Sequence, residues 1–527
     1  MFFTSALADV KSPPARSVER ADAIDIGSQR ELFVDDYLIE RLTGKGELRL
    51  QHPVPQEIVL EHNAPWEGNA TGYHSIFKDG DRYRMYYRAA GFRFRPDGGI
   101  DGEHPSKPAG AKGYGYICYA ESDDGIHWRK PELGLIDFQG SKANNIVLMS
   151  GPLGDVNIDV SSPAVFKDEN PNVAPDARYK ATVQDNNQAR PPWGLLLLKS
   201  PDGLHWKPMQ TKPILTDGTF DTLNLAYWDA ERREYRAYWR YFTTPETDEE
   251  RSWKPPGYRA NRTATSQDML IWTGQADLTY GESPKQHLYT AGIKAYYRAP
   301  HLFVGFPTRY VHRGWSDVMR ALPDPQERET RAIKMERRGT SITEALFIAS
   351  RDGVAFKRWE EAFLRPGIER PRTWTYGSNY IGWHLLETKS LLEGAPNELS
   401  LYATEGYWIG NGTTLRRYTL RLDGFVSLQA PMVGGGLISK PLRFQGKRLT
   451  LNLATSAAGS VRVEIQDASG KPLPGFTLDD CPALFGDTID RTVTWTHGSD
   501  VSSLANQPVR LRFEIKNGDL FSFQFSD

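Results

Sequence analysis

The sequence predicts an all-β protein in which a five-bladed β-propeller is followed by a C-terminal β-sandwich. A short turn motif centred on Asp-Gly recurs along most of the chain, and the C-terminal part alternates between apolar and polar residues at period two. With 527 residues, 39% of them hydrophobic, the chain exceeds one ordinary domain. We expect a lead-in over 1–58 that packs on the propeller, the propeller over 59–432 and the sandwich over 433–527.

The clearest copy of the turn motif runs from Ser200 to Trp206 and reads Ser-Pro-Asp-Gly-Leu-His-Trp. Asp-Gly provides the positive φ and the local hydrogen bonds of a tight turn, and the Trp returns the chain to an apolar surface. Further copies begin at Ser122, Ser266 and Ser350, and a faint one begins at Leu422. Spacings of roughly 60–85 residues with a constant core are typical of propeller blades that carry loops of different lengths.

Segments rich in aromatic and β-branched residues predict the strands of each blade. In the first blade, two such segments flank the turn Lys78-Asp79-Gly80-Asp81, and sets of three segments then repeat four more times. The blade count is therefore five. The predicted strands are 73–77, 82–88 and 114–120 in blade one; 162–166, 179–183 and 194–198 in blade two; 223–228, 234–239 and 258–264 in blade three; 292–297, 301–306 and 342–349 in blade four; and 380–385, 399–403 and 415–422 in blade five.

The pattern changes after Pro431, where three consecutive glycines over 434–436 mark a domain boundary. The segments beyond it alternate at period two, which indicates strands with one buried face, as in a β-sandwich. Such a domain either binds carbohydrate or caps the propeller, and the sequence leaves both interpretations open. The predicted strands are 448–453, 460–465, 492–495, 509–515 and 520–525.

The charge balance excludes some classes of partner. With 64 basic and 66 acidic residues the net charge is −2, which gives no electrostatic case for nucleic acid or an anionic membrane. A neutral substrate fits this balance better. The 14 Trp and 24 Tyr residues suit cross-strand pairs in a β-rich core, and loop aromatics also suit stacking on sugar rings.

The cysteines and the N-terminal residues indicate where in or outside the cell the protein is located. Cys118 and Cys481 lie in different predicted domains, so we expect two buried free thiols and no disulfide framework. No apolar run approaches the roughly 18 residues that a membrane span requires. The opening Met1 to Asp9 ends like a signal-peptide cleavage site but lacks a basic start, and from it we expect a secreted or periplasmic protein.

The antiparallel order of strands in a blade predicts which face carries the chemistry. First-strand starts and second-strand ends share one face, whereas the Asp-Gly turns lie on the opposite face, so we predict that their aspartates are turn residues. Long loops on a rigid scaffold are the usual place for a site. The long loops of the shared face are 89–112, 186–193, 242–256 and 311–340, the last with a short helix around 327–338.

Three carboxylates recur at the starts of first strands, and we predict them as the catalytic residues: Glu67, Asp159 and Asp221. The alternative for each carboxylate is a structural role, either capping the start of a strand or lying in a loop. Arg88 and Arg240 could hold a carboxylate or sulfate of an acidic sugar, the alternative being surface ion pairs. The predicted substrate-binding residues on the same face are Trp66, Arg88, Asp185, Arg240, Tyr289, Tyr376, Glu405 and Trp408.

This arrangement resembles the five-bladed propeller glycoside hydrolases of families 43 and 32 and the related mannoside phosphorylases. The resemblance covers the architecture over about 60–430, and it implies acids at the channel end of successive first strands, serving as base or nucleophile, pKa modulator and general acid. The family motifs Asn-Asp-Pro, Arg-Asp-Pro and Glu-Cys are absent, with Glu67 standing where Asp is usual and Asp221 where Glu is usual. Some family 43 members hold Ca²⁺ in the channel, but no cofactor or metal is predicted here because no His pair or Cys cluster has ligand spacing.

We therefore expect an exo-acting glycoside hydrolase of plant or algal saccharides that works through a carboxylate pair. One alternative is a non-catalytic carbohydrate-binding propeller. Another is a glycoside phosphorylase, in which clustered basic residues replace one carboxylate at the pocket floor. The observation that separates these hypotheses is whether Glu67, Asp159 and Asp221 converge on one pocket, since fold alone does not choose among them.

Overall fold

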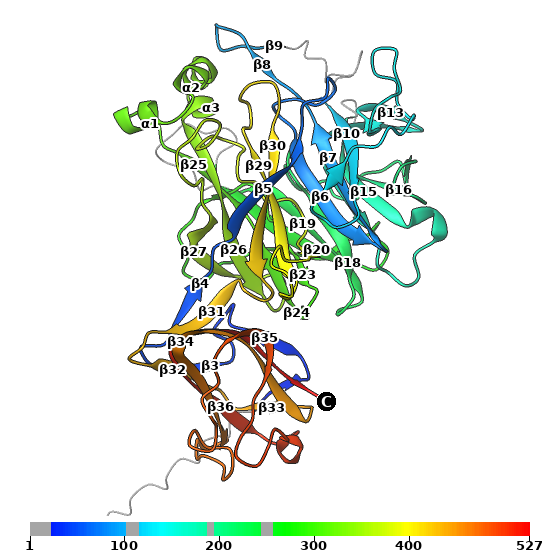
Figure 1. Ribbon diagram of the computed structural model, residues 1–527. Helices are drawn as coiled ribbons and strands as arrows, with labels where there is room; N and C mark the ends of the chain where they lie inside the picture. Colours follow the sequence, from blue (N-terminus) through cyan, green and yellow to red (C-terminus); the bar gives the residue numbers. More distant parts are fainter. Residues whose placement is uncertain (1–22, 102–114, 187–193, 244–256) are drawn as a thin grey trace, which may run out of the picture.

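A computed structural model describes residues 23–101, 115–186, 194–243 and 257–527. Five antiparallel sheets surround a central axis as the blades of a propeller, and a separate all-β domain adjoins one end (Figure 1). This arrangement confirms the predicted all-β class and the five-bladed propeller. None of the helices in the described part of the chain is long and apolar enough to cross a membrane.

The first four blades follow the chain in order, and each has strands that run alternately up and down. Blade one contains β6 (Gly72–Asp79), β7 (Arg82–Ala89), β10 (Tyr116–Ser122), β11 (Trp128–Arg129) and β12 (Ile146–Met149). Blade two contains β13 (Gly151–Leu153), β14 (Val156–Lys167), β15 (Tyr179–Asp185), β16 (Leu195–Ser200) and β17 (Lys207–Pro208). Blade three contains β18 (Leu225–Asp229), β19 (Glu234–Phe242), β20 (Arg259–Ser266) and β21 (Thr273–Asp277). Blade four contains β22 (His287–Leu288), β23 (Lys294–Tyr296), β24 (Ala299–Gly305), β25 (Thr308–His312), β26 (Ser341–Ser350) and β27 (Lys357–Leu364).

Blade five closes the ring with a strand from the other end of the chain. Its own strands are β28 (Leu386–Thr388), β29 (Glu398–Glu405) and β30 (Thr414–Arg421), and β5 (Val54–Glu61) pairs antiparallel with β30 as the outer strand. The propeller therefore begins at Val54 rather than at residue 59. Because this pairing joins residues that are far apart in the sequence, a local strand pattern does not show it.

The turn motif has one hydrogen-bond pattern in four copies. In each copy the Ser hydroxyl accepts the backbone N–H three residues on, at 2.9 Å, and the Asp carboxylate accepts two further N–H groups. The position after the Asp has a positive φ, which explains why Gly is preferred there. These residues are Gly125 (76°), Gly203 (82°), Met269 (65°) and Gly353 (77°). The aspartates are turn residues, as predicted.

Ten strands form the domain at the C-terminal end, and they include the lead-in. The strands are β1 (Ile24–Gly27), β2 (Arg30–Leu32), β3 (Ile39–Gly44), β4 (Glu47–Leu50), β31 (Val426–Ala430), β32 (Gly435–Ser439), β33 (Leu442–Phe444), β34 (Arg448–Asp467), β35 (Asp487–Thr492) and β36 (Val509–Ser526). The lead-in contacts the propeller through ion pairs of Arg351 with Glu31 and Asp35. The prediction that it packs on the propeller as a separate segment is nevertheless wrong, because the lead-in belongs to the C-terminal sheet. Its four strands pair with C-terminal strands, because these offer edges that the short lead-in strands can cover.

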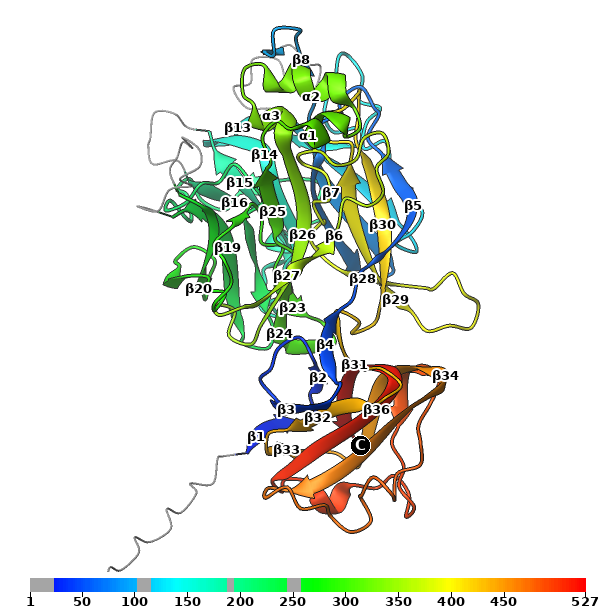
Figure 2. The ribbon, with the colours of Figure 1, turned by 90° about the vertical axis from the view of Figure 1, so that its left-hand side faces the viewer.

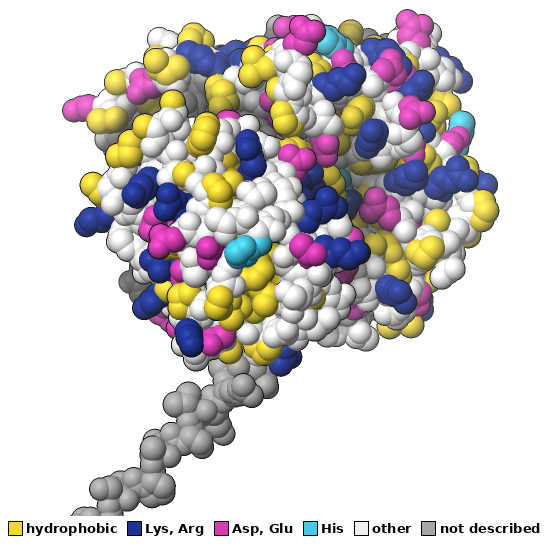
Figure 3. Space-filling view, turned by 60° about the horizontal axis from the view of Figure 1, so that its bottom comes forward, with side chains coloured by type: hydrophobic (Ala, Val, Ile, Leu, Met, Phe, Trp, Pro, Cys, Tyr) yellow, Lys and Arg dark blue, Asp and Glu magenta, His cyan; other side chains and the backbone are white. Residues whose placement is uncertain are grey.

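The two longest strands of this domain, β34 and β36, each join two segments that the sequence pattern predicts as separate strands. They pair along most of their lengths, with a register shift between Thr455 and Ser460 that lets the sheet bend without breaking. A single hydrophobic cluster, including Leu451, Phe513 and Phe525, fills the interior. Figure 3 views the molecule with this end forward and shows acidic and basic side chains interspersed over the surface.

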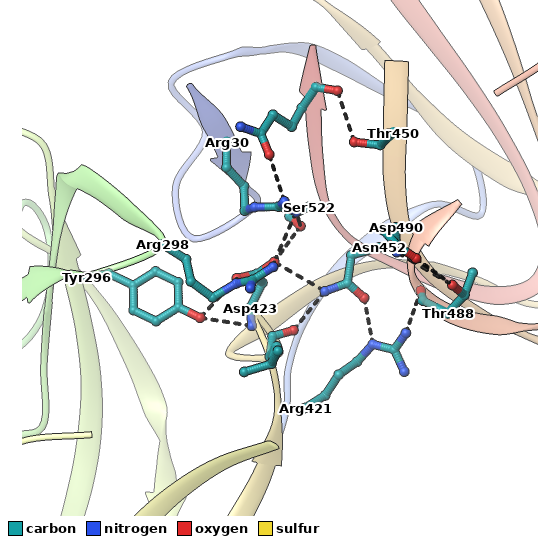
Figure 4. A network of polar contacts seen from close by, with 12 residues as sticks. Arg30, Tyr296, Arg298, Arg421, Asp423, Thr450, Asn452, Thr488, Asp490 and Ser522 are labelled. Atoms are coloured by element: carbon teal, nitrogen blue, oxygen red, sulfur yellow. Dashed lines mark hydrogen bonds and ion pairs between the residues drawn. The ribbon is translucent and has the colours of Figure 1, made fainter. Parts of the chain in front are cut away.

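Asp423, from the faintest copy of the turn motif, joins the two domains (Figure 4). Its carboxylate is fully buried, and although burial alone would raise its pKa, ion pairs and hydrogen bonds led by Arg298 lower the pKa. The donors come from blade four, the lead-in and the C-terminal domain. They are Arg298 at 2.8 Å, Tyr296 at 2.9 Å, Ser522 at 2.8 Å, Asn452 at 3.2 Å and Arg30 at 3.4 Å.

The propeller has two different ends, seen from the side in Figure 2. We call the end that carries α1 (Asp317–Ala321), α2 (Pro325–Ala332) and α3 (Arg337–Thr340) the upper end, and the end beside the C-terminal domain the lower end. The helices lie in the long loop over 311–340, close to the predicted helix, and the hairpin β8 (Arg93–Phe94) with β9 (Ile100–Asp101) lies at the same end. Parts of the other long loops, and Met1 to Asp9, lie outside the described residues.

Candidate functional site

A cavity of about 170 Å³ opens at the upper end, close to the central axis. We call it the upper cavity. Blades three, four and five and the helical loop all contribute to it. The lining residues are Asp221, Arg259, Tyr289, Tyr310, Met335, Arg337, Arg338, Tyr376 and Trp408.

Asp221 is the only carboxylate among the described residues that line this cavity. It lies just before β18, on a turn that Asn224 holds by donating to the carbonyls of Phe220 at 2.8 Å and Thr222 at 2.6 Å. Its side chain is 65% exposed, and Arg240 donates a hydrogen bond to it. The carboxylate is thus fixed at its base and open to solvent.

Arg240 reaches Asp221 from the end of β19, the second strand of the same blade. It is 1% exposed, and its guanidinium lies 4.9 Å from the centroid of the Tyr289 ring. Burial alone would lower the pKa of Arg240, but Asp221 and the neighbouring phenols raise it, so the side chain is a cation. Its Nε and Nη1 atoms have no hydrogen-bond partner in the described part of the chain.

Aromatic rings form the wall and floor of the upper cavity. The Tyr376 hydroxyl donates to the Tyr289 hydroxyl at 3.1 Å, and the Tyr376 ring lies 4.9 Å from Trp408 and 5.8 Å from Tyr310. Burial raises the pKa of Tyr376 well above its ordinary value, so this phenol is neutral. Trp408 adopts a left-handed φ of 63°, and its backbone N–H donates to the carbonyl of Asn69 at 2.6 Å, which fixes the ring over the cavity.

A narrow crevice of about 10 Å³ adjoins the cavity and shares Tyr376 with it. Arg88 lines it and donates to the carbonyls of Ala70 and Ser161 and to the Tyr407 hydroxyl, all of them neutral acceptors. The Tyr380 hydroxyl, which also lines the crevice, has no hydrogen-bond partner among the described residues. Cations and phenols therefore dominate this end of the channel.

Of the residues predicted from the sequence, six lie at the upper cavity or its crevice. Asp221, Tyr289, Tyr376 and Trp408 line the cavity, Arg240 lies directly behind Asp221, and Arg88 lines the crevice. They come from strand ends of different blades. The antiparallel order of the blades explains why they share one face.

Glu67 lies apart from this group, inside the first blade. Its carboxylate is buried and accepts hydrogen bonds from the Tyr87 hydroxyl at 2.6 Å, from the Lys130 ammonium at 2.6 Å and from the backbone N–H of Ala64 at 2.9 Å. Trp66 beside it donates to the Asn145 side chain at 2.8 Å. Neither residue faces the upper cavity, because partners from the same blade hold both side chains.

Asp159, Asp185 and Glu405 also lie off the cavity lining. Asp159 is half-buried and accepts the backbone N–H of Ser161 at 2.8 Å, and Asp185 is buried at the end of β15. Glu405 is buried between Arg370 at 2.5 Å and Arg416 at 2.9 Å, and although burial alone would raise its pKa, these arginines lower it. The three predicted catalytic carboxylates therefore do not converge.

The sequence did not single out several residues of the cavity. Arg259, Tyr310, Arg337 and Arg338 line it, and only the last two lie in a loop that the sequence marked as functional. Arg259 begins the third strand of its blade, a position that the strand pattern does not distinguish. Among the described residues no group of three or more His, Cys, Asp or Glu side chains could hold a metal ion.

Comparisons with known proteins give structural similarity alone. No family model matches the chain, and no curated protein matches it. Similar solved structures include the BT0996 protein in a complex with RGII, with 14% identity, 70% of this chain and 92% of that chain covered, and a TM-score of 0.43. They also include an N-acetylgalactosamine deacetylase from F. plautii in complex with blood group B trisaccharide (11% identity, 71% and 94% covered, TM-score 0.40). A third is the Bombyx mori GH32 β-fructofuranosidase BmSUC1 (8% identity, 91% and 94% covered, TM-score 0.37). Similarity at this level transfers no activity, substrate or residue role to this chain.

Proposed function

We propose that the protein is a glycoside hydrolase that cleaves a glycosidic bond in the upper cavity, with Asp221 as its catalytic carboxylate. The observation that carries the proposal is an open, arginine-fixed carboxylate surrounded by the rings of Tyr289, Tyr376 and Trp408. Aromatic faces bind sugar rings by stacking, and a carboxylate can activate water or attack the anomeric carbon.

The roles follow from the surroundings of each group. Asp221 is held by the Arg240 cation, which suits it to be the base or nucleophile. Asp159 remains our candidate for the general acid, because it lies two residues from Ser161, whose carbonyl accepts a hydrogen bond from Arg88 at the crevice. Because the crevice that adjoins the cavity measures only about 10 Å³, we propose that the cavity takes the end of a saccharide chain and that the enzyme is exo-acting on plant or algal saccharides.

The test is turnover on a panel of nitrophenyl glycosides and oligosaccharides, followed by the variant Asp221→Asn on any substrate found. We expect kcat to fall by roughly 100-fold or more, since a catalytic acid or base contributes about that factor. Asp217→Asn is the matched control, because Asp217 lies in the same loop, is 69% exposed and is paired with Arg262 at 2.5 Å, but does not line the cavity. Turnover of the Asp221 variant within a few-fold of the parent would exclude the assignment.

A carbohydrate-binding protein without catalysis is the second candidate. It is favoured by the presence of one carboxylate, not a pair, among the described lining residues. Saccharide binding measured by calorimetry, with no product released from any bound saccharide after prolonged incubation, would select this candidate over the hydrolase.

A further inference from the structure

The upper cavity is far more cationic than the protein as a whole. Its described lining contains three arginines and one carboxylate, and Arg240 lies directly behind that carboxylate. The whole chain has a net charge of −2, and the surface in Figure 3 mixes both signs. The positive charge of the cavity lining therefore contrasts with the balanced charge of the whole chain.

Two of these arginines lack the partners that a structural role would supply. Arg338 is half-buried and makes no ion pair with any described residue, and Arg240 has two guanidinium nitrogens without a hydrogen-bond acceptor in the described part of the chain. An arginine that is held only for stability is expected to have its donors satisfied by carboxylates or carbonyls. Arg88 at the crevice fits that expectation, because neutral acceptors fill its donor positions.

The crowding of like charges has an energetic consequence. Burial and the neighbouring Arg337 lower the pKa of Arg338, and burial together with Arg240 lowers the pKa of Arg259. A bound anion would relieve this repulsion, whereas a neutral sugar would leave it in place. Guanidinium groups bind carboxylate and sulfate oxygens in a bidentate geometry, which makes arginine the usual residue for such ligands.

We infer that the upper cavity takes a saccharide whose ring carries a carboxylate or sulfate group, with Arg338 binding the anion, Arg240 adding positive charge from behind Asp221, and Tyr376 and Trp408 contacting the ring. The inference rests on the proposed function only in placing a sugar in this cavity. The buried Trp408 indole N–H and Tyr380 hydroxyl have no hydrogen-bond partners among the described residues.

The test compares ligands that differ only in charge. Oligogalacturonide is measured against its methyl ester, and a sulfated galactan oligosaccharide against its desulfated form, by calorimetry on the full chain at low and high salt. For at least one pair we expect the charged form to bind about tenfold or more tightly at low salt, with the difference shrinking as salt screens the charges. Equal affinities in both pairs, or tighter binding of the neutral forms, would overturn the inference.

Variants then locate the anion. Arg338→Gln should weaken binding of the charged form more than binding of the neutral form and so reduce the preference to within about threefold. Arg338→Lys should give an intermediate preference, because Lys keeps the charge but not the bidentate guanidinium geometry. Arg320→Gln is the matched control, since Arg320 lies in the same loop, is half-exposed and is paired with Glu329 at 2.9 Å. A preference that survives Arg338→Gln unchanged would place the anion elsewhere and contradict the assignment.

Measurements with inorganic phosphate distinguish an anionic group on the saccharide from free phosphate as the ligand of the arginines. We expect phosphate to compete weakly and not to be consumed during turnover. Phosphate-dependent cleavage that forms a sugar phosphate would show that the arginines hold free phosphate, which overturns the inference. Charge-selective binding without cleavage would sink the hydrolase proposal alone, and cleavage of neutral glycosides with no charge preference would sink this inference alone.

Discussion

The two ends of the propeller both contain a cavity, and the larger one is at the end that we do not assign to function. The lower cavity measures about 690 Å³ and the upper one about 170 Å³. At the lower end the carboxylates of Asp124 and Glu387 are already engaged: Asp124 caps its turn, and Glu387 accepts from Tyr297 at 2.6 Å and Asn397 at 2.7 Å. At the upper end guanidinium, indole and phenol donors lack acceptors among the described residues.

This difference teaches that volume is a poor guide to a site in a propeller. The lower cavity is the space between blade turns, and the residues that line it hold those turns together. The upper cavity is small, but the Arg240 guanidinium and the Trp408 indole beside it have donors without acceptors among the described residues. The comparison yields predictions in which changes at the lower end alter stability and changes at the upper end alter binding and turnover.

The largest effect on stability is expected at Asp423, where the lower end meets the C-terminal domain. Asp423→Asn leaves Arg298 and Arg30 without their anionic partner in a buried junction. We expect the free energy of unfolding to fall by at least about 2 kcal/mol, measured by urea titration, because breaking a buried ion pair leaves an uncompensated charge. The exposed Asp490, which lies in the same network, serves as control through Asp490→Asn and should change little.

The same residue predicts a pH dependence. The pKa of Asp423 is lowered in the folded protein, so its contribution to stability is present above the unfolded-state pKa of about 4. That contribution is lost as the pH falls through the folded-state pKa. Asp423→Asn should therefore be less sensitive than the parent to acid below about pH 4, measured as the urea midpoint against pH. Parallel acid limbs for the two proteins would contradict this account.

A smaller effect is expected at Asp202, in the clearest turn at the lower end. Asp202→Asn keeps an oxygen for the N–H groups of Leu204 and His205 but loses the charge paired with His205 at 2.7 Å. Because the side chain is well exposed, the stability loss should stay below about 1 kcal/mol, with turnover within about twofold of the parent. A collapse of turnover would show that the chemistry is at the lower end.

The features that could be predicted from the sequence are those that short local motifs encode. The turn motif repeats because each copy satisfies its own backbone, as the Ser200 hydroxyl and the Asp202 carboxylate do, so the blades could be counted. The pairing of β5 with β30 and of the lead-in with the C-terminal strands could not be predicted, because period-two segments do not specify a distant partner.

The candidate site shows the same limit at the level of side chains. Glu67 and Asp221 occupy equivalent positions in the sequence pattern, yet Lys130 and Tyr87 enclose the first, and Arg240 leaves the second open to solvent. Which of the two carboxylates is accessible depends on neighbouring strands and not on the turn itself. Arg338 was missed for a related reason, since a charged residue in a helical loop is usually a solvated one.

The smallest effect is expected at His384 in the lower cavity, and it tests the comparison most directly. Both ring nitrogens of His384 lack hydrogen-bond partners among the described residues, which makes it the strongest candidate for ligand recognition at that end. Burial and Lys294 lower its pKa well below the ordinary value, so the ring is neutral, and it packs in a tilted arrangement against Trp383 with centroids 3.8 Å apart. This packing accounts for the ring without a ligand. His384→Gln should therefore leave saccharide affinity and kcat within about twofold of the parent, once thermal unfolding has shown that the variant is folded. A large loss of affinity in a folded His384 variant, with Arg338→Gln unchanged, would reverse the roles of the two ends.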